Sequence, residues 1–278
     1  MFDNRILLIA TKHQKETVIG PLFKKSFDLN SKISVNFDTD SLGTFTGEVE
    51  RINDPLTTLK NKCLLAMDIE GEDLAVANEG SFGPHPQFYF APVDNELAIF
   101  IDKVNGIEII ASETTLNTNF SGRVVHSYQD LLSFANESKF PSHALILRKE
   151  EDFKDDVFKG ISSTDDLISA FHFIFNKYGS VFAETDMRAM YNPSRMLVIE
   201  KVFEKLIKKI NSKCPQCSTI GFDAVFSKPG LPCNECGFNT RSILLHHYQC
   251  KKCDYSEDKL FPNGFLKEDP MYCDICNP

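Results

Sequence analysis

The sequence repeats one spacing four times, in Cys214-Pro215-Gln216-Cys217, Cys233-Asn234-Glu235-Cys236, Cys250-Lys251-Lys252-Cys253 and Cys273-Asp274-Ile275-Cys276. Each pair can direct both of its sulfur atoms at one metal ion, and two pairs complete a tetrahedral thiolate site for zinc. Fifteen residues (218–232) separate the first pair from the second, and 19 (254–272) separate the third from the fourth. Both gaps are typical of zinc ribbons.

The eight thiolates predict two zinc ions, each held by four cysteines. We favour sequential pairing, in which the first two pairs form one site and the last two the other; crossed pairing stays open. Because no ligand position is left vacant, both ions are expected to be structural, holding together a tail too small to fold alone. The ninth cysteine, Cys63, is expected in a helix core.

The charge of the tail argues against nucleic acid as its partner. Residues 212–278 contain seven Lys or Arg and eight Asp or Glu, a net charge of −1. A surface that follows a phosphate backbone needs a positive excess. The chain as a whole carries −9, which also disfavours a coat for nucleic acid or for an anionic membrane. Protein contact or simple stapling of the domain suits the tail better.

The composition is that of a globular protein: of 278 residues, 42% are hydrophobic and 24 are Phe, enough to fill a sizeable core. The apolar run at residues 6–10 is too short for a membrane span or a signal-peptide core. We therefore expect a cytoplasmic protein with no membrane partner. The oligomeric state stays open.

The body of the chain, residues 1–210, predicts an α/β domain with a mixed twisted sheet and flanking helices, followed by a double zinc ribbon over 211–278. Hydrophobic periodicity separates strands from helices. Strands are predicted at 5–11, 32–37, 73–78, 87–90, 97–102, 107–111, 144–148 and 181–185. Helices are predicted at 55–67, from Ser127 to Glu137, after Ser163, and from Asn192-Pro193 onward.

Four polar segments lie where strands are predicted to end or helices to begin. The first contains Thr11 and Lys15 and resembles a phosphate-holding turn, with a solvated helix start as the alternative. The second, residues 38–51, offers carboxylates to a hard metal ion, or forms a polar loop. The other two segments contribute the remaining candidates: Glu79, Ser81 and His85 in residues 79–86, and Asp186, Arg188 and Arg195 in residues 184–195.

The last two segments also have alternative interpretations. His85 suits acid–base chemistry or metal binding, but it can equally belong to a turn-rich surface loop. Two arginines at a helix N-terminus suit an anionic ligand. An internal ion pair with Glu184 or Asp186 explains the same pattern.

The motifs taken together resemble a prokaryotic family of unknown function whose members carry the same four cysteine pairs. The resemblance covers nearly the whole chain. It rests on residues 10–16, 38–48, 79–86, 184–189, 192–196 and 273–278. It implies no activity.

The order of the motifs is also similar to that of the inosine/xanthosine triphosphate pyrophosphatase superfamily. The matching residues are Thr11 and Lys15, then Glu48 with Lys62, then Glu79-Gly80, then Asn192 to Arg195. This chain departs from that pattern: His13 replaces an Asn, the acidic loop has one carboxylate instead of two, and Ser194-Arg195 lacks an intervening His.

The similarity implies a triphosphate bridged by Mg²⁺ at Glu48 and Glu79. Lys15, Lys62 and Arg195 would neutralise its charge. We therefore predict a small anionic ligand and a nucleotide or phosphate-ester hydrolase. The alternative is a non-enzymatic adaptor whose zinc ribbons contact protein or nucleic acid.

Overall fold

The computed structural model describes residues 2–37, 54–85 and 89–278. The chain divides into two compact units, Met1–Ile207 and Lys208–Pro278. The first is a mixed α/β unit, as the hydrophobic pattern predicts, and the second contains the four cysteine pairs. Among the helices of the described residues, none is long and apolar enough to cross a membrane.

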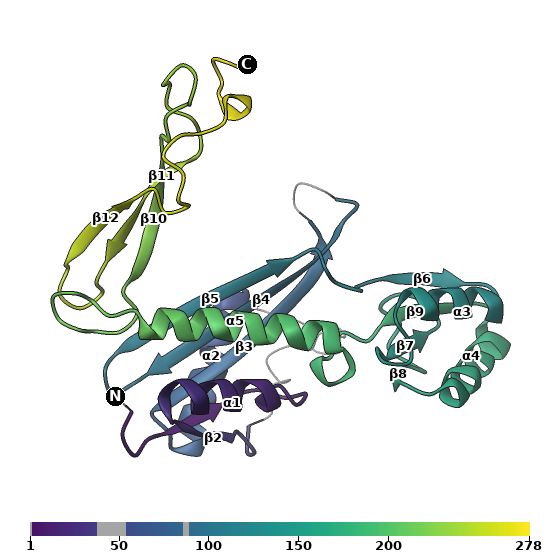
Figure 1. The fold of residues 1–278 in the computed structure, drawn as a ribbon. Helices are drawn as coiled ribbons and strands as arrows, with labels where there is room; N and C mark the ends of the chain where they lie inside the picture. Colours follow the sequence, from purple (N-terminus) through teal and green to yellow (C-terminus); the bar gives the residue numbers. More distant parts are fainter. Residues whose placement is uncertain (1, 38–53, 86–88) are drawn as a thin grey trace. The chain divides into compact units, whose positions relative to one another are not determined.

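The first unit is built on a five-stranded sheet in the order β2-β1-β3-β4-β5 (Figure 1). β1 runs parallel to both of its neighbours, whereas the β3–β4 and β4–β5 pairs are antiparallel. The strands are β1 (Ile6–Ile9), β2 (Asn30–Ile33), β3 (Leu74–Pro84), β4 (Pro92–Asp102) and β5 (Ile107–Thr115). α1 (Glu16–Phe27) joins β1 to β2, and α2 (Pro55–Glu70) precedes β3.

Each face of this sheet is covered by helices. On one face α2 buries Leu59, Cys63 and Met67 against apolar residues of β1, β3 and β4, so Cys63 is a core residue as predicted. On the other face Phe23 of α1 stacks on Phe100 of β4 and meets Phe203 of α5 (Pro193–Asn211) edge-on. Residues that alternate along β3 and β4 therefore face different helices.

A second, four-stranded sheet in the order β6-β9-β7-β8 completes this unit. Its strands are β6 (Gly122–Val125), β7 (Leu145–Arg148), β8 (Phe158–Ile161) and β9 (Val181–Thr185). The helices α3 (Tyr128–Glu137) and α4 (Thr164–Tyr178) pack their apolar faces on it. Ser127 and Ser163 cap them through the amides of Asp130 and Asp166. A short 3-10 helix, η2 (Ala189–Tyr191), leads into α5.

The second unit is a three-stranded antiparallel sheet in the order β10-β11-β12. Its strands are β10 (Asp223–Pro229), β11 (Ile243–Gln249) and β12 (Ser256–Leu260), followed by the 3-10 helix η3 (Pro270–Tyr272). The cysteine pairs lie in the segments before, between and after these strands.

The strand predicted at residues 87–90 is wrong where the structure describes it, because Tyr89 and Phe90 form a turn. β3 and β4 pair as a long hairpin whose last partners are Pro84 and Pro92, and the amide of His85 donates to the carbonyl of Ala91 at 2.8 Å. Tyr89 and Phe90 thus lie where the chain reverses direction between the two strands.

Candidate functional site

The segment between β1 and α1 is strained. His13 and Gln14 both have left-handed backbone conformations, with φ of 69° and 60°, which is uncommon for residues other than glycine. α1 then begins without a side-chain cap. Such strain concentrates at functional sites, where the surrounding structure maintains it. This segment places Lys15 near the carboxyl end of β1, and only 8% of the surface of Lys15 is exposed.

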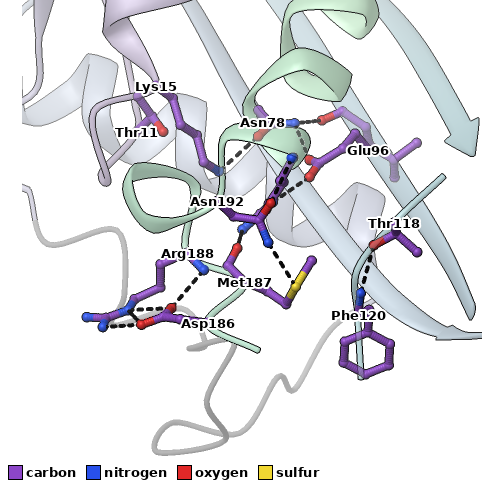
Figure 2. Close-up of polar contacts among 12 residues, drawn as sticks. Thr11, Lys15, Asn78, Glu96, Thr118, Phe120, Asp186, Met187, Arg188 and Asn192 are labelled. Carbon is purple, nitrogen blue, oxygen red and sulfur yellow. Dashed lines mark hydrogen bonds and ion pairs between the residues drawn. The ribbon is translucent and has the colours of Figure 1, made fainter. Parts of the chain in front are cut away.

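A chain of buried polar contacts runs from Lys15 to Arg195, and Figure 2 labels its first three members, Lys15, Asn78 and Glu96. The ammonium of Lys15 donates to Oδ1 of Asn78 at 2.8 Å, and the Asn78 amide donates to Oε2 of Glu96 at 2.8 Å. The other oxygen of Glu96 accepts from Nε of Arg195 at 2.7 Å. The network thus joins α1, β3, β4 and the first turn of α5.

Gly80 of β3 makes room for the arginine. A Cβ at position 80 would lie 2.6 Å from Oε1 of Glu96 and closer still to Nη2 of Arg195. The guanidinium also lies 5.0 Å from the ring centroid of Phe82 and donates to the carbonyl of Met187 at 2.5 Å. Arg195 is therefore fixed from three sides.

Burial shifts the pKa of two groups in this network. Desolvation, aided by the nearby Arg195 charge, lowers the pKa of Lys15 from 10.5 to about 7. Desolvation, aided by the Glu96 carboxylate, raises the pKa of Asp94 from 3.8 to about 7. Oδ1 of Asp94 is buried without a hydrogen-bond partner. Pairs of groups whose pKa values are shifted close to neutral pH are characteristic of sites that bind charged ligands or transfer protons.

A second ion pair lies on the other face of the sheet. Lys62 of α2 donates to Oε2 of Glu79 at 2.6 Å, and both side chains are about nine-tenths buried. Asn78 and Glu79 are consecutive in β3 and point to opposite faces. The charges of Lys62 and Glu79 nevertheless influence the pKa of Lys15. The predicted residues Lys15, Lys62, Glu79 and Arg195 are thus gathered around the end of β1, in two linked groups.

Asp186 and Arg188 form a pair of their own. The carboxylate of Asp186 is fully buried, accepts from Nη2 of Arg188 at 2.6 Å and also accepts from the amide of Gly160 at 3.0 Å. The internal ion pair foreseen as an alternative for this segment is therefore present. It holds the turn that precedes α5, one residue from the carbonyl that binds Arg195.

Three further predicted residues lie beside this site or along β3. Thr11 is buried at the end of β1 and donates to the carbonyl of Lys12 at 3.1 Å. Ser81 is half-buried on β3 opposite Asn95, and half-buried His85 follows the strand. Glu48 lies outside the described residues.

Asn78, Asp94 and Glu96 were missed as site residues by the sequence analysis. Two carboxylates two residues apart, as at 94 and 96, share one face of a strand. That signal went unused because the strand was predicted to begin at Leu97, whereas β4 begins at Pro92.

The eight paired cysteines gather into two groups of four, in each of which all sulfur atoms lie within 4.8 Å of one another. One group contains Cys214, Cys217, Cys250 and Cys253, and the other contains Cys233, Cys236, Cys273 and Cys276. Sulfur atoms of different cysteine pairs lie 3.6 Å apart at two contacts in the first group, and 3.5 and 3.8 Å apart in the second. A tetrahedral ion with bonds of about 2.3 Å sets its sulfurs about 3.8 Å apart. The donors therefore fit zinc.

Among residues 2–37, 54–85 and 89–278, no other set of three or more metal-ligating side chains lies close enough together to hold an ion. The carboxylates of Glu79, Asp94 and Glu96 do not form such a set there. The predicted Mg²⁺ site is thus not assembled by the residues that the structure describes.

The sequential pairing of cysteines is wrong, and the antiparallel sheet explains why. We call each Cys-x-x-Cys segment a knuckle. Asp223 at the start of β10 pairs with Gln249 at the end of β11, so the knuckles before β10 and after β11 lie at one end of the sheet. The second knuckle follows β10 at the opposite end. β12 returns the chain to that end, since Leu260 pairs with Leu245. Each passage across the sheet moves the chain from one site to the other.

The knuckles share a tight backbone path. The residue after the second cysteine is left-handed in three of them, with φ of 59° at Ser218, 73° at Gly237 and 57° at Asp254. Amides inside two knuckles point at sulfur, from Glu235 to Cys233 and from Lys252 to Cys250, both at 3.4 Å. Such donors help to disperse the charge of bound thiolates.

One comparison with known proteins gives a match. The sequence model of a family described as a domain of unknown function (DUF6671) matches residues 62–278. No curated protein and no solved structure matches the chain.

Proposed function

We propose, for a chain that belongs to the DUF6671 family of unknown function, that the polar network at the carboxyl end of β1 binds a nucleotide or another phosphorylated anion. The zinc-ribbon tail would be a structural element held by two closed tetrathiolate sites. The observation that carries the proposal is the gathering of three buried cations around one strand end: Lys15 directly before α1, Lys62 in α2 and Arg195 in α5.

The position within the fold supports this proposal. β1 lies between two parallel neighbours, and the connections through α1 and α2 lead to opposite sides of it. In open α/β sheets, ligands bind outside the carboxyl ends of the strands where the strand order reverses in this way. The strained residues His13 and Gln14 lie at that point.

The charge balance supports an anion. Burial, and after it repulsion from Arg195 and Lys62, lowers the pKa of Lys15, whereas the carboxylates of Glu96 and Glu79 raise it. A phosphate group would relieve this repulsion and restore the ammonium form of Lys15. Arginine and lysine donors are the usual partners of phosphate oxygens.

Hydrolysis of a nucleoside triphosphate with release of pyrophosphate is the specific activity that we propose. The experiment is calorimetric titration of the zinc-loaded chain with a panel of nucleoside triphosphates, including those of inosine and xanthosine, and with pyrophosphate, followed by assays of pyrophosphate and phosphate release with Mg²⁺ in the buffer. Lys15→Gln should weaken binding about 10- to 100-fold, the usual worth of one charged hydrogen bond. Glu79→Gln should abolish release while leaving the fold intact.

Lys25→Gln is the matched control, because Lys25 is an exposed residue of α1, the helix that begins directly after Lys15. Binding that Lys25→Gln and Lys15→Gln weaken equally would place the ligand elsewhere. Absence of binding by every nucleotide and by pyrophosphate would remove the proposal.

An adaptor function is the second candidate, and it has its own observation. The tail exposes several large apolar side chains close in sequence to the second or the fourth cysteine pair: Phe238, Phe265, Leu266, Met271, Tyr272 and Ile275. Exposed apolar side chains that cluster are typical of protein-binding surfaces. Capture of a protein partner that is lost when Met271 and Ile275 are replaced by serine would support this function.

A further inference from the structure

The turn between α3 and β7 brings a histidine against the first turn of α5. Nε2 of His143 lies 2.8 Å from Oγ of Ser194, and Nδ1 lies 3.0 Å from Oγ of Ser142. His143 is 5% exposed, whereas Ser194 is half-buried and Ser142 is exposed. A buried imidazole therefore meets the hydroxyl of a half-buried serine.

The surrounding hydrogen bonds determine which nitrogen of His143 carries the proton. The amide of Ser194 donates to Nε2 at 3.2 Å, and an N–H can point only at a lone pair. Nε2 is therefore the unprotonated nitrogen, and Nδ1 carries the hydrogen. The hydroxyl of Ser142 donates to the carbonyl of Lys139 at 2.7 Å, which leaves its oxygen free to accept from Nδ1.

In this tautomer Nε2 has no hydrogen to donate, so the Ser194 hydroxyl is the donor and shares the lone pair of Nε2 with the Ser194 amide. A hydroxyl that donates to the imidazole is the arrangement that a general base requires. The ammonium of Lys139 donates to the same Oγ at 3.3 Å. Both contacts stabilise Ser194 as it loses its proton. Burial and the nearby Lys139 charge also lower the pKa of His143, so the imidazole is held in its neutral form, which is the form that can accept a proton.

We propose that Ser194 is a nucleophile activated by His143, and that this dyad takes acyl groups from carboxylic esters. Oγ forms a bond to the carbonyl carbon while its proton passes to Nε2 of His143. The carbon–oxygen bond to the alcohol then breaks, and the alkoxide leaves with that proton as the free alcohol. Water, activated by the same imidazole, hydrolyses the acyl-serine to the carboxylic acid and regenerates the hydroxyl.

Lys139 completes the site. Its flexible side chain carries three donors, one of which already reaches Oγ. The oxyanion forms on the attacked carbon, two bonds from Oγ, and so comes within reach of the same ammonium. The proposal is independent of anion binding at Lys15, because none of its contacts involves that network.

The experiment treats the full-length, zinc-loaded chain with a fluorophosphonate probe. Oγ forms a bond to phosphorus, the phosphorus–fluorine bond breaks, and fluoride leaves while His143 takes the proton. Intact mass and peptide mapping should find the label on Ser194. Label should be absent from Ser194→Ala, which keeps the backbone amide that binds His143, and unchanged in Ser133→Ala, an exposed serine of α3.

His143→Gln should slow labelling at least 100-fold, the usual contribution of a general base. Its side-chain oxygen can still accept from the Ser194 amide, and circular dichroism checks its fold. Lys139→Gln, an exposed change, should slow labelling about tenfold. Wild-type protein that stays unlabelled at Ser194, or a rate that neither variant lowers, would overturn the proposal. p-Nitrophenyl acetate supplies the second readout: a burst of nitrophenol is expected from wild type and is missing from Ser194→Ala.

Discussion

Replacing Gly80 by alanine tests the arrangement around Arg195 most directly. The added Cβ would lie 2.6 Å from Oε1 of Glu96 and nearer to Nη2 of Arg195, so both groups must retreat by roughly half an ångström. Neither can do so freely. Glu96 is fully buried and holds Asn78, and the guanidinium is fixed by Met187 and Phe82.

The expected cost is about 1–3 kcal/mol, the usual penalty for overpacking a core. Alanine gains back about 0.4–1 kcal/mol by restricting the unfolded chain. Gly83→Ala on the same strand shows this gain alone, since an added Cβ there meets nothing within 4 Å. Urea unfolding followed by circular dichroism should therefore rank Gly80→Ala well below wild type, and Gly83→Ala level with it or above. Equal stabilities of the two variants would refute the packing that we describe.

Three further predictions concern the metal sites and the two shifted groups. Zinc analysis should find two ions per wild-type chain and one in the double variant Cys217→Ser/Cys253→Ser. Cys217→Ser/Cys236→Ser should lose both, whereas sequential pairing predicts that it keeps one. The pKa of Lys15 is about 7 in the folded state against 10.5 as its ordinary value, so the folded chain binds fewer protons between these values. Stability should thus rise with pH across that window, and less so in Lys15→Met, as unfolding measured at several pH values would reveal. The pKa of Asp94 is raised from 3.8 to about 7, so its contribution to stability is present below pH 4 and is lost as the pH rises through 7. Asp94→Asn should reduce that loss, and an unchanged pH profile would contradict the burial of this carboxyl.

The cysteine pairs and the major helices could be predicted from sequence because their signals are local. A knuckle needs two residues at a fixed spacing, and α4 needs only a capping serine and an apolar stripe. The pairing of knuckles depends on the register of β10 and β11, which no single segment contains. The bounds and the register of the tail strands were not predicted, so their consequence for the metal sites could not be predicted either.

The polar network was predictable in part for the same reason. Lys15 and Arg195 were identified because each adjoins an unusual local motif. Their partners Asn78 and Glu96 occupy strand interiors, where a polar residue gains its meaning only from the neighbouring strand. His143 was missed because its contact with Ser194 joins segments 51 residues apart, and a lone histidine carries no sequence signal.

The crossed cysteine groups determine the order in which the two metal sites can be completed during synthesis of the chain. The first group cannot close until Cys253 has been synthesised, and the second waits for Cys276. While the first knuckle emerges from the ribosome, its two thiols have no intramolecular partners and are open to oxidation or to exchange with other metal carriers. Finishing the β10–β11 hairpin at Gln249 completes neither site, because the first group still lacks Cys250 and Cys253 and the second lacks the pair that follows β12. A nascent chain therefore passes through a stage in which the first group of four cysteines is complete and the second still lacks Cys273 and Cys276.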